Sequence, residues 1–170
     1  MSRLNNRPGR RFRWTAWSVG AASAVVLTAV LAGPTVARMF TLNVATHAPV
    51  TNQSHKTVHE SIVVDSAAKA VYSLSGDSKS HPECRKANHC FRFWPPVKVA
   101  SARRLSKAPG VPGKLGTWKR DGFIQVTLGG RPLYTFAGDK MKRHATGQGI
   151  KAFGGKWSVT KARSTARGWS

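Results

Sequence analysis

Hydrophobic and polar residues alternate in short runs over most of the chain after residue 59, which is the pattern of β-strands. The clearest pair of runs, 114–118 and 123–128, flanks Lys119–Gly122. This connection contains the dipeptide Asp121-Gly122, a strong signal for a hairpin turn. A second turn at Gly129-Gly130 leads into the run 131–136, so three consecutive strands are predicted to form a meander.

Other runs extend this pattern in both directions. Further strands are predicted over 61–64, 70–74, 91–94, 97–99 and 156–160. The stretch 100–113 is expected to be a loop with a short helical turn, and 137–151 a loop containing three glycines. Short strands with Gly and Pro turns, and no amphipathic helix of useful length, predict an all-β fold, either a small sandwich or a barrel.

The N-terminal part has a different pattern. Residues 1–13 contain five arginines, and residues 14–33 follow with no charged side chain. Twenty uncharged residues match the length that spans a bilayer, and the arginines predict that the head stays in the cytoplasm. We therefore expect a transmembrane signal anchor, which favours the inner membrane of a bacterium. The alternatives are a signal peptide cleaved after Thr35-Val36-Ala37, with secretion of the rest, and a buried helix of a soluble protein.

These patterns divide the chain into five segments. The expected order is a basic cytoplasmic head (1–13), the hydrophobic segment (14–33), a linker (34–58), a β domain (59–162) and a tail (163–170). The linker is predicted because that stretch is rich in Thr, Asn, Ser and His and shows no sustained period.

The charge is strongly positive. The chain has 28 Lys and Arg against 6 Asp and Glu, a net charge of +22. Such a charge favours anionic partners, here envelope polymers or lipid headgroups, although it also serves solubility. The basic residues are scattered singly or in pairs, without a basic helix or zinc-finger spacing, so no specific nucleic-acid partner is expected.

One motif occurs twice. Tyr72 and Asp77 recur 62 residues later as Tyr134 and Asp139, and a Trp follows each Tyr at nearly the same distance. The first motif consists of Tyr72, Leu74, Asp77 and Trp94, and the second of Tyr134, Phe136, Asp139 and Trp157. Two occurrences at matched positions predict two repeated β units.

The motif residues have a functional and a structural interpretation. Asp77 and Asp139 would serve as a carboxylate pair for catalysis or a cation, or each would close its turn by accepting backbone N–H groups. The aromatic side chains would line a pocket for a quinone, haem or sugar, or form the inner face of a sandwich; they are Phe93, Trp94, Tyr134, Phe136, Phe153 and Trp157. We favour the structural interpretation for both sets. The sequence has no nucleophile elbow or phosphate-binding loop, so we expect no enzyme activity, catalytic residue or cofactor.

The two cysteines are the remaining candidates. Cys84 and Cys90 are expected to form a disulfide, because both follow the hydrophobic segment and would lie in an oxidising compartment. The alternative is a copper or zinc site made by His81, Cys84, His89 and Cys90.

The motifs together resemble a family of bacterial predicted lipoproteins named for its Yx(FWY)xxD motif, a secreted repeat of unknown function. The resemblance rests on the tyrosine–aspartate motif, the cysteines before Trp94-Pro95-Pro96 and the glycine run before Trp157, over residues 59–162. It implies an extracytoplasmic cell-envelope protein without established enzyme activity.

The chain departs from this family in three places. No Cys precedes Cys84, so no lipid-attachment cysteine is present and residues 14–33 would have to anchor the protein. Leu74 replaces an aromatic residue of the motif, and the basic run 141–144 replaces a turn. We therefore expect a non-catalytic binding or structural domain with a basic surface, or else a metal-binding or redox-associated envelope protein.

Overall fold

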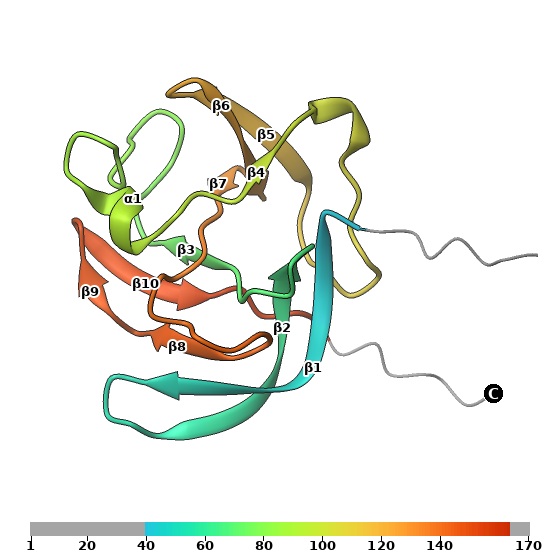
Figure 1. The fold of residues 1–170 in the computed structure, drawn as a ribbon, viewed down its shortest axis with the longest axis vertical. Helices are drawn as coiled ribbons and strands as arrows, with labels where there is room; N and C mark the ends of the chain where they lie inside the picture. The colour runs from blue at the N-terminus through green and yellow to red at the C-terminus, as the bar shows by residue number, and fades with distance from the viewer. Residues whose placement is uncertain (1–39, 164–170) are drawn as a thin grey trace, which may run out of the picture. The chain divides into compact units, whose positions relative to one another are not determined.

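The computed structural model describes residues 40–163, and this part of the chain is mostly β-structure (Figure 1). Its strands are β1 (Leu42–Asn52), β2 (Thr57–Asp65), β3 (Tyr72–Leu74), β4 (Lys98–Val99), β5 (Leu115–Arg120), β6 (Phe123–Leu128), β7 (Arg131–Pro132), β8 (Ala145–Gln148), β9 (Lys151–Ala152) and β10 (Gly155–Val159). The helical elements are α1 (Cys90–Phe93) and the 3-10 turn η1 (Ala102–Arg104). The predicted all-β class is confirmed.

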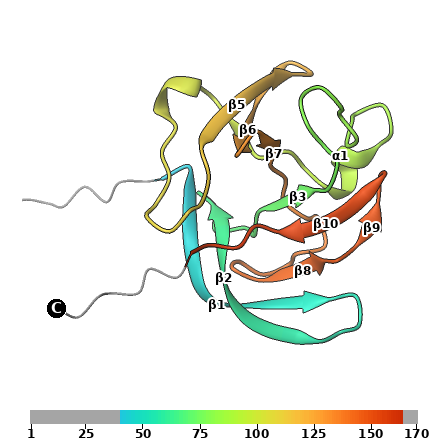
Figure 2. The same ribbon diagram turned by 180° about the vertical axis from the view of Figure 1, so that it is seen from behind.

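The strands form three small sheets, with the orders β2-β1-β8, β3-β10-β9 and β4-β6-β5, and β7 pairs with β6. In Figure 2 the β5–β6 hairpin lies at the opposite end of the molecule from the β1–β2 hairpin, with β3 and β10 between them. None of these sheets closes into a barrel within residues 40–163, so the barrel alternative is wrong for this part of the chain.

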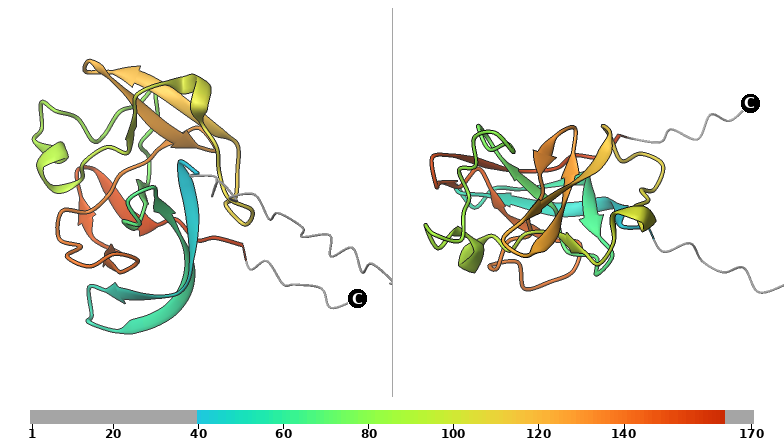
Figure 3. Two further views of the ribbon diagram at one scale, coloured as in Figure 1. Left: turned by 45° about the vertical axis from the view of Figure 1, so that its right-hand side comes forward. Right: turned by 90° about the horizontal axis from the view of Figure 1, so that it is seen from above.

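The longest element lies where the sequence predicts a linker. Strands β1 and β2 pair antiparallel from Leu42–Asp65 to Thr51–Thr57, and they curve around the other strands in Figure 3. The linker prediction is therefore wrong for residues 42–58. A bulge between Ala45 and Ala48, with His47 at φ 55°, shifts the alternation by one residue. This shift hid the period of two, because small Ala side chains fill the buried positions on both sides of the bulge.

The meander predicted downstream is observed. Asp121 and Gly122 connect β5 and β6 with φ angles of 46° and 77°. Two positive φ values in a two-residue loop match the backbone twist of the flanking strands, which explains the choice of Asp-Gly. The third strand is shorter than predicted, since β7 covers only Arg131–Pro132. The loop expected over 137–151 contains β8 and the start of β9, which pair with β1 and β10.

Residues 91–93 are helical and Trp94 lies in a bend, so the strand predicted over 91–94 is wrong. Cys90–Phe93 forms a single turn, α1, preceded by His89 in the left-handed conformation at φ 60°. The disulfide between Cys84 and Cys90 brings the chain back on itself immediately before this turn. The tight reversal prevents Phe91 and its neighbours from continuing in a strand.

The interior contains two hydrophobic clusters. One cluster contains the tyrosines and tryptophans of both motifs, together with Ile62 and the disulfide. The other is aliphatic and joins Leu42 and Val63 to Val126 and Leu133. The tyrosines and tryptophans of the motifs thus belong to one core, in which Tyr72 and Trp157 come from the paired strands β3 and β10.

Three predicted segments fall on residues that the structure does not describe: the basic head, the hydrophobic segment 14–33 and residues 164–170 of the tail. Within residues 40–163, no helix has the length and apolar character needed to cross a membrane.

Candidate functional site

The two motifs exchange hydrogen bonds. The Tyr134 hydroxyl donates to Asp77 Oδ2 at 2.6 Å, and the Tyr72 hydroxyl donates to Asp139 Oδ2 at 2.8 Å. Each tyrosine therefore bonds the aspartate of the other motif. Their backbones are paired as well, since Tyr72 N donates to Tyr134 O at 2.8 Å and Tyr134 N donates to Tyr72 O at 3.0 Å.

The second oxygen of each carboxylate accepts from the backbone. Asp77 Oδ1 accepts the N–H of Glu83 at 2.8 Å, and Asp139 Oδ1 accepts the N–H of Thr146 at 2.7 Å. The structural interpretation predicted backbone bonds of this kind, and these contacts match it. The bonds to the tyrosines were not predicted, because the spacing within one motif does not indicate which motif supplies the partner.

Both tyrosine hydroxyls act as neutral donors. Burial, followed by the negative charge of Asp139, raises the pKa of Tyr72 far above its ordinary value. Burial and the hydrogen bond to Asp77 raise the pKa of Tyr134 in the same direction. Each hydroxyl also accepts one bond, from Gly147 N at 3.2 Å and from Arg120 Nη2 at 3.3 Å, respectively. Within the two motifs, each tyrosine hydroxyl and each aspartate oxygen therefore has a partner, whereas the buried Trp157 Nε1 has none among the described residues.

The motif aromatics pack against one another. Trp94 and Trp157 stack with ring centroids 3.8 Å apart and an interplanar angle of 3°. Each is met edge-on by the tyrosine of its own motif, Tyr72 at 5.3 Å and Tyr134 at 5.2 Å. Phe136 stacks on the other side of Trp94 at 4.4 Å. This arrangement fills the space that a quinone, haem or sugar would need.

The remaining aromatic candidates lie outside this stack. Leu74, the aliphatic substitute in the first motif, is fully buried and lies opposite Trp157 in the β3–β10 ladder. Phe93 is 53% exposed, and its ring lies 6.3 Å from that of Phe153. Phe93 and Phe153 are therefore an edge of the core and not part of its centre.

Cys84 and Cys90 form the predicted disulfide. Asn88 holds the loop between them, with its Nδ2 donating to Glu83 O at 2.7 Å and its Oδ1 accepting from Arg85 N at 3.0 Å. Because each sulfur is bonded to the other, neither thiolate that the copper or zinc alternative requires is present.

The other two residues of that alternative are both exposed, His81 before this loop and His89 on it. Within residues 40–163, no group of three or more His, Cys, Asp and Glu side chains is arranged to hold a metal ion. The metal set His81, Cys84, His89 and Cys90 is therefore not assembled in this part of the chain.

Sequence reasoning missed Arg120. The side chain of Arg120 is only 8% exposed. Its guanidinium donates to Cys84 O at 2.9 Å and lies 4.2 Å above the ring of Trp118 and 4.8 Å above that of Phe91. Arg120 thus links the disulfide loop to the β5–β6 hairpin. A single arginine in an amphipathic strand carries no signal that would have revealed this role.

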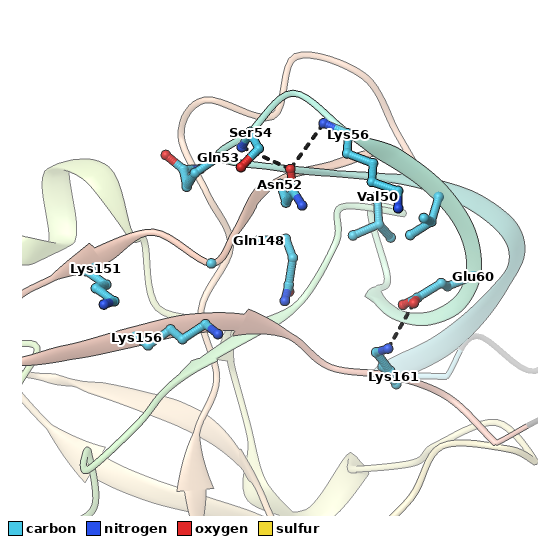
Figure 4. A pocket seen from close by; sticks show the side chains of 12 residues that line it. Val50, Asn52, Gln53, Ser54, Lys56, Glu60, Gln148, Lys151, Lys156 and Lys161 are labelled. Atoms are coloured by element: carbon cyan, nitrogen blue, oxygen red, sulfur yellow. Dashed lines mark hydrogen bonds and ion pairs between the residues drawn. The ribbon is translucent and has the colours of Figure 1, made fainter.

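A pocket with a volume of about 390 Å³ opens beside β1 and β8 (Figure 4). Four lysines line it: Lys56 on the β1–β2 turn, Lys151 on β9, Lys156 on β10, and Lys161 after β10. Lys161 Nζ is paired with Glu60 Oε1 at 2.8 Å. The pocket is therefore basic, with three lysines beyond the one that Glu60 neutralises.

Comparison with known proteins gives one match. Residues 117–161 match the model of a family described as a secreted repeat of unknown function. This is the family that the motifs resemble. The matched stretch contains all residues of the second motif, but not Tyr72 and Asp77, to which that motif is hydrogen-bonded. No curated protein and no solved structure matches the chain. A secreted family and a disulfide agree with an extracytoplasmic location of this domain.

Proposed function

We propose that the chain is an extracytoplasmic envelope protein whose β domain, built of two related units, has no catalytic role and binds anionic envelope polymers through its basic surface. The observation that carries this proposal is that the polar motif residues are hydrogen-bonded to one another in the interior, while most of the basic side chains lie on the surface. The tyrosines and aspartates of the motifs hydrogen-bond one another, so in this proposal a partner binds to the surface.

That surface has a strong excess of positive charge. Residues 40–163 contain 21 Lys and Arg against six Asp and Glu. Only two ion pairs occur in this part of the chain, Arg120–Asp121 and Lys161–Glu60. Most of the basic side chains therefore face solvent without a carboxylate partner, an arrangement that attracts polyanions and favours their encounter.

The two-unit architecture is supported by the matched contacts of the motifs. Each tyrosine bonds the other motif's aspartate, and each meets the edge of its own motif's tryptophan. Such reciprocity is what a duplicated unit packed against its copy would give. In this proposal residues 14–33 anchor the protein in the inner membrane.

Binding of the purified full chain to an anionic polymer tests this proposal. We expect binding to poly(glycerol phosphate) at low ionic strength, weakening as salt rises, and no binding to dextran of similar length, because the attraction is screened by salt. Lack of binding to the anionic polymer at low salt would exclude the proposed role. Protease treatment of intact spheroplasts tests the location: the β domain should be degraded while cytoplasmic markers survive.

A further inference from the structure

The pocket between the β1–β2 turn and the β9–β10 hairpin has features that a generally basic surface does not require. We infer that it is a specific site for a phosphate or phosphodiester group of an anionic polymer, held by Lys56, Lys151 and Lys156 with amide donors from Asn52 and Gln148. This inference rests on the proposed function and assigns it a location.

The first argument concerns two lysines. Lys151 and Lys156 lie directly opposite each other in the β9–β10 ladder. Like charges in this position destabilise a sheet. No carboxylate within residues 40–163 pairs with either side chain. An anion bound between them would turn this unfavourable contact into a favourable one.

The second argument concerns two amides. Asn52 and Gln148 are paired in the parallel register of β1 and β8, and both line the pocket. Asn52 Oδ1 accepts from Ser54 N at 2.9 Å and Lys56 N at 3.1 Å, while Gln148 Oε1 accepts from Val159 N at 2.9 Å.

Because backbone N–H groups occupy both amide oxygens, the orientation of each amide is fixed. The NH₂ groups of Asn52 and Gln148 remain as donors without an acceptor among the described residues, and Figure 4 shows both side chains among those that line the pocket. Three ammonium groups and two amides make a lining of donors, which suits a ligand with acceptor oxygens only.

Glu60 is the one carboxylate in the lining, and Lys161 neutralises it. The side chains that line the pocket therefore carry a net excess of three positive charges, which successive phosphates of a phosphodiester chain can neutralise. We favour a polymer over a lipid headgroup because Val58 is the only large hydrophobic side chain exposed at this site, and a membrane-docking surface needs an apolar face to insert.

The test compares variants of equal charge. Lys56→Gln/Lys151→Gln/Lys156→Gln removes the pocket lysines. The control Lys114→Gln/Lys119→Gln/Lys142→Gln removes three exposed lysines that lie outside this pocket and donate no side-chain hydrogen bond within residues 40–163. Calorimetric titration with poly(glycerol phosphate) should show affinity weakened at least about tenfold in the pocket variant and at most about twofold in the control.

A second variant distinguishes loss of the binding site from a folding defect. Asn52→Asp keeps the oxygen that accepts from the Ser54 and Lys56 backbones and replaces the NH₂ donor with a repelling oxygen. Affinity should again fall about tenfold, while the near-ultraviolet circular dichroism spectrum stays unchanged. Independently, Lys151→Gln should raise the thermal midpoint of the free protein, since it removes the like-charge contact.

The outcomes are distinct. Equal losses in both triple variants would mean diffuse attraction, so the pocket would be wrong while the proposed function stood. Full affinity in Asn52→Asp would also overturn the pocket. No binding by the unaltered chain would remove the proposed function itself. Binding to detergent micelles containing phosphatidylglycerol in preference to the polymer, lost in the pocket variant, would replace the polymer with a lipid.

Discussion

The exchanged bonds between the motifs lead to a quantitative prediction for Tyr134→Phe. The change removes a buried hydroxyl that donates to the Asp77 carboxylate at 2.6 Å. Asp77 is only 3% exposed, so water cannot readily replace the lost donor. A hydrogen bond to a charged group contributes about 1.5–3 kcal/mol, and a buried unsatisfied acceptor adds to the loss. We expect the free energy of unfolding to fall by about 2–3 kcal/mol.

Urea unfolding followed by tryptophan fluorescence measures this loss, because Trp157 packs edge-on against Tyr134. The control is Thr135→Val, which removes a hydroxyl whose only bond, to Pro95 O, is 3.4 Å long. It should cost less than about 1 kcal/mol, as expected for a long bond between neutral groups.

A double-mutant cycle identifies the partner of Tyr134. Tyr134→Phe combined with Asp77→Asn should show a coupling energy of about 1 kcal/mol or more, because the two residues are in contact. The same change combined with Asp139→Asn should show almost none, since Asp139 bonds Tyr72 instead. Coupling to Asp139 and not to Asp77 would refute the exchange and restore a motif closed within its own unit.

Three further predictions follow from the same contacts. Both tyrosines have a pKa raised above the unfolded value of about 10, so the stability that they contribute is present below that pH. Above it, the free energy of unfolding should fall by up to about 1.4 kcal/mol per pH unit for each tyrosine. Because the chain has only two tyrosines, phenolate absorbance should appear together with unfolding and not before it. Replacing Cys84 and Cys90 by Ser should lower stability by about 2 kcal/mol in urea unfolding, the value for a loop this short. Gly147→Ala should cost about 1–3 kcal/mol in thermal unfolding, since its Cβ would lie 2.7 Å from Trp94 Cη2, whereas Gly76→Ala, with open space around it, should cost about 1 kcal/mol from its positive φ alone.

Local signals in the sequence predicted the elements that are determined by local chemistry. The β5–β6 hairpin follows from Asp121-Gly122, and the disulfide follows from two cysteines in a domain expected to lie outside the cytoplasm. Strand β1 was missed because its bulge breaks the period of two, so a polar stretch with buried Ala45 and Ala48 resembled a linker. The helical turn at Cys90 was missed because the disulfide, and not the alternation of its residues, determines the backbone there.

For the candidate sites, too, the sequence predicted individual residues but not the contacts between distant segments. Periodic spacing identified the motif tyrosines and aspartates, and the burial of Tyr72, Tyr134 and Asp77 agrees with the structural interpretation, while Asp139 is half-buried. It could not identify which tyrosine bonds which aspartate, since that depends on how distant segments pack. The basic pocket was equally inaccessible, because Lys56 and Lys151 are far apart in sequence and meet only through the parallel pairing of β1 and β8.

The hydrogen bonds between the two motifs also bear on which residues are available to bind a partner. The stretch that matches the secreted repeat family, 117–161, contains Tyr134 and Asp139, but their partners Asp77 and Tyr72 lie outside it. The second motif alone would therefore leave the buried Tyr134 hydroxyl and the half-buried Asp139 carboxylate without these partners, which costs stability. The hydrogen bonds between the motifs thus join segments that are far apart in sequence, and they occupy the hydroxyls and carboxylates of the motif residues. Lys151 and Lys156 have no lysine at the matched positions 62 residues earlier, so the proposed pocket would be a feature of this surface and not of the repeated motif.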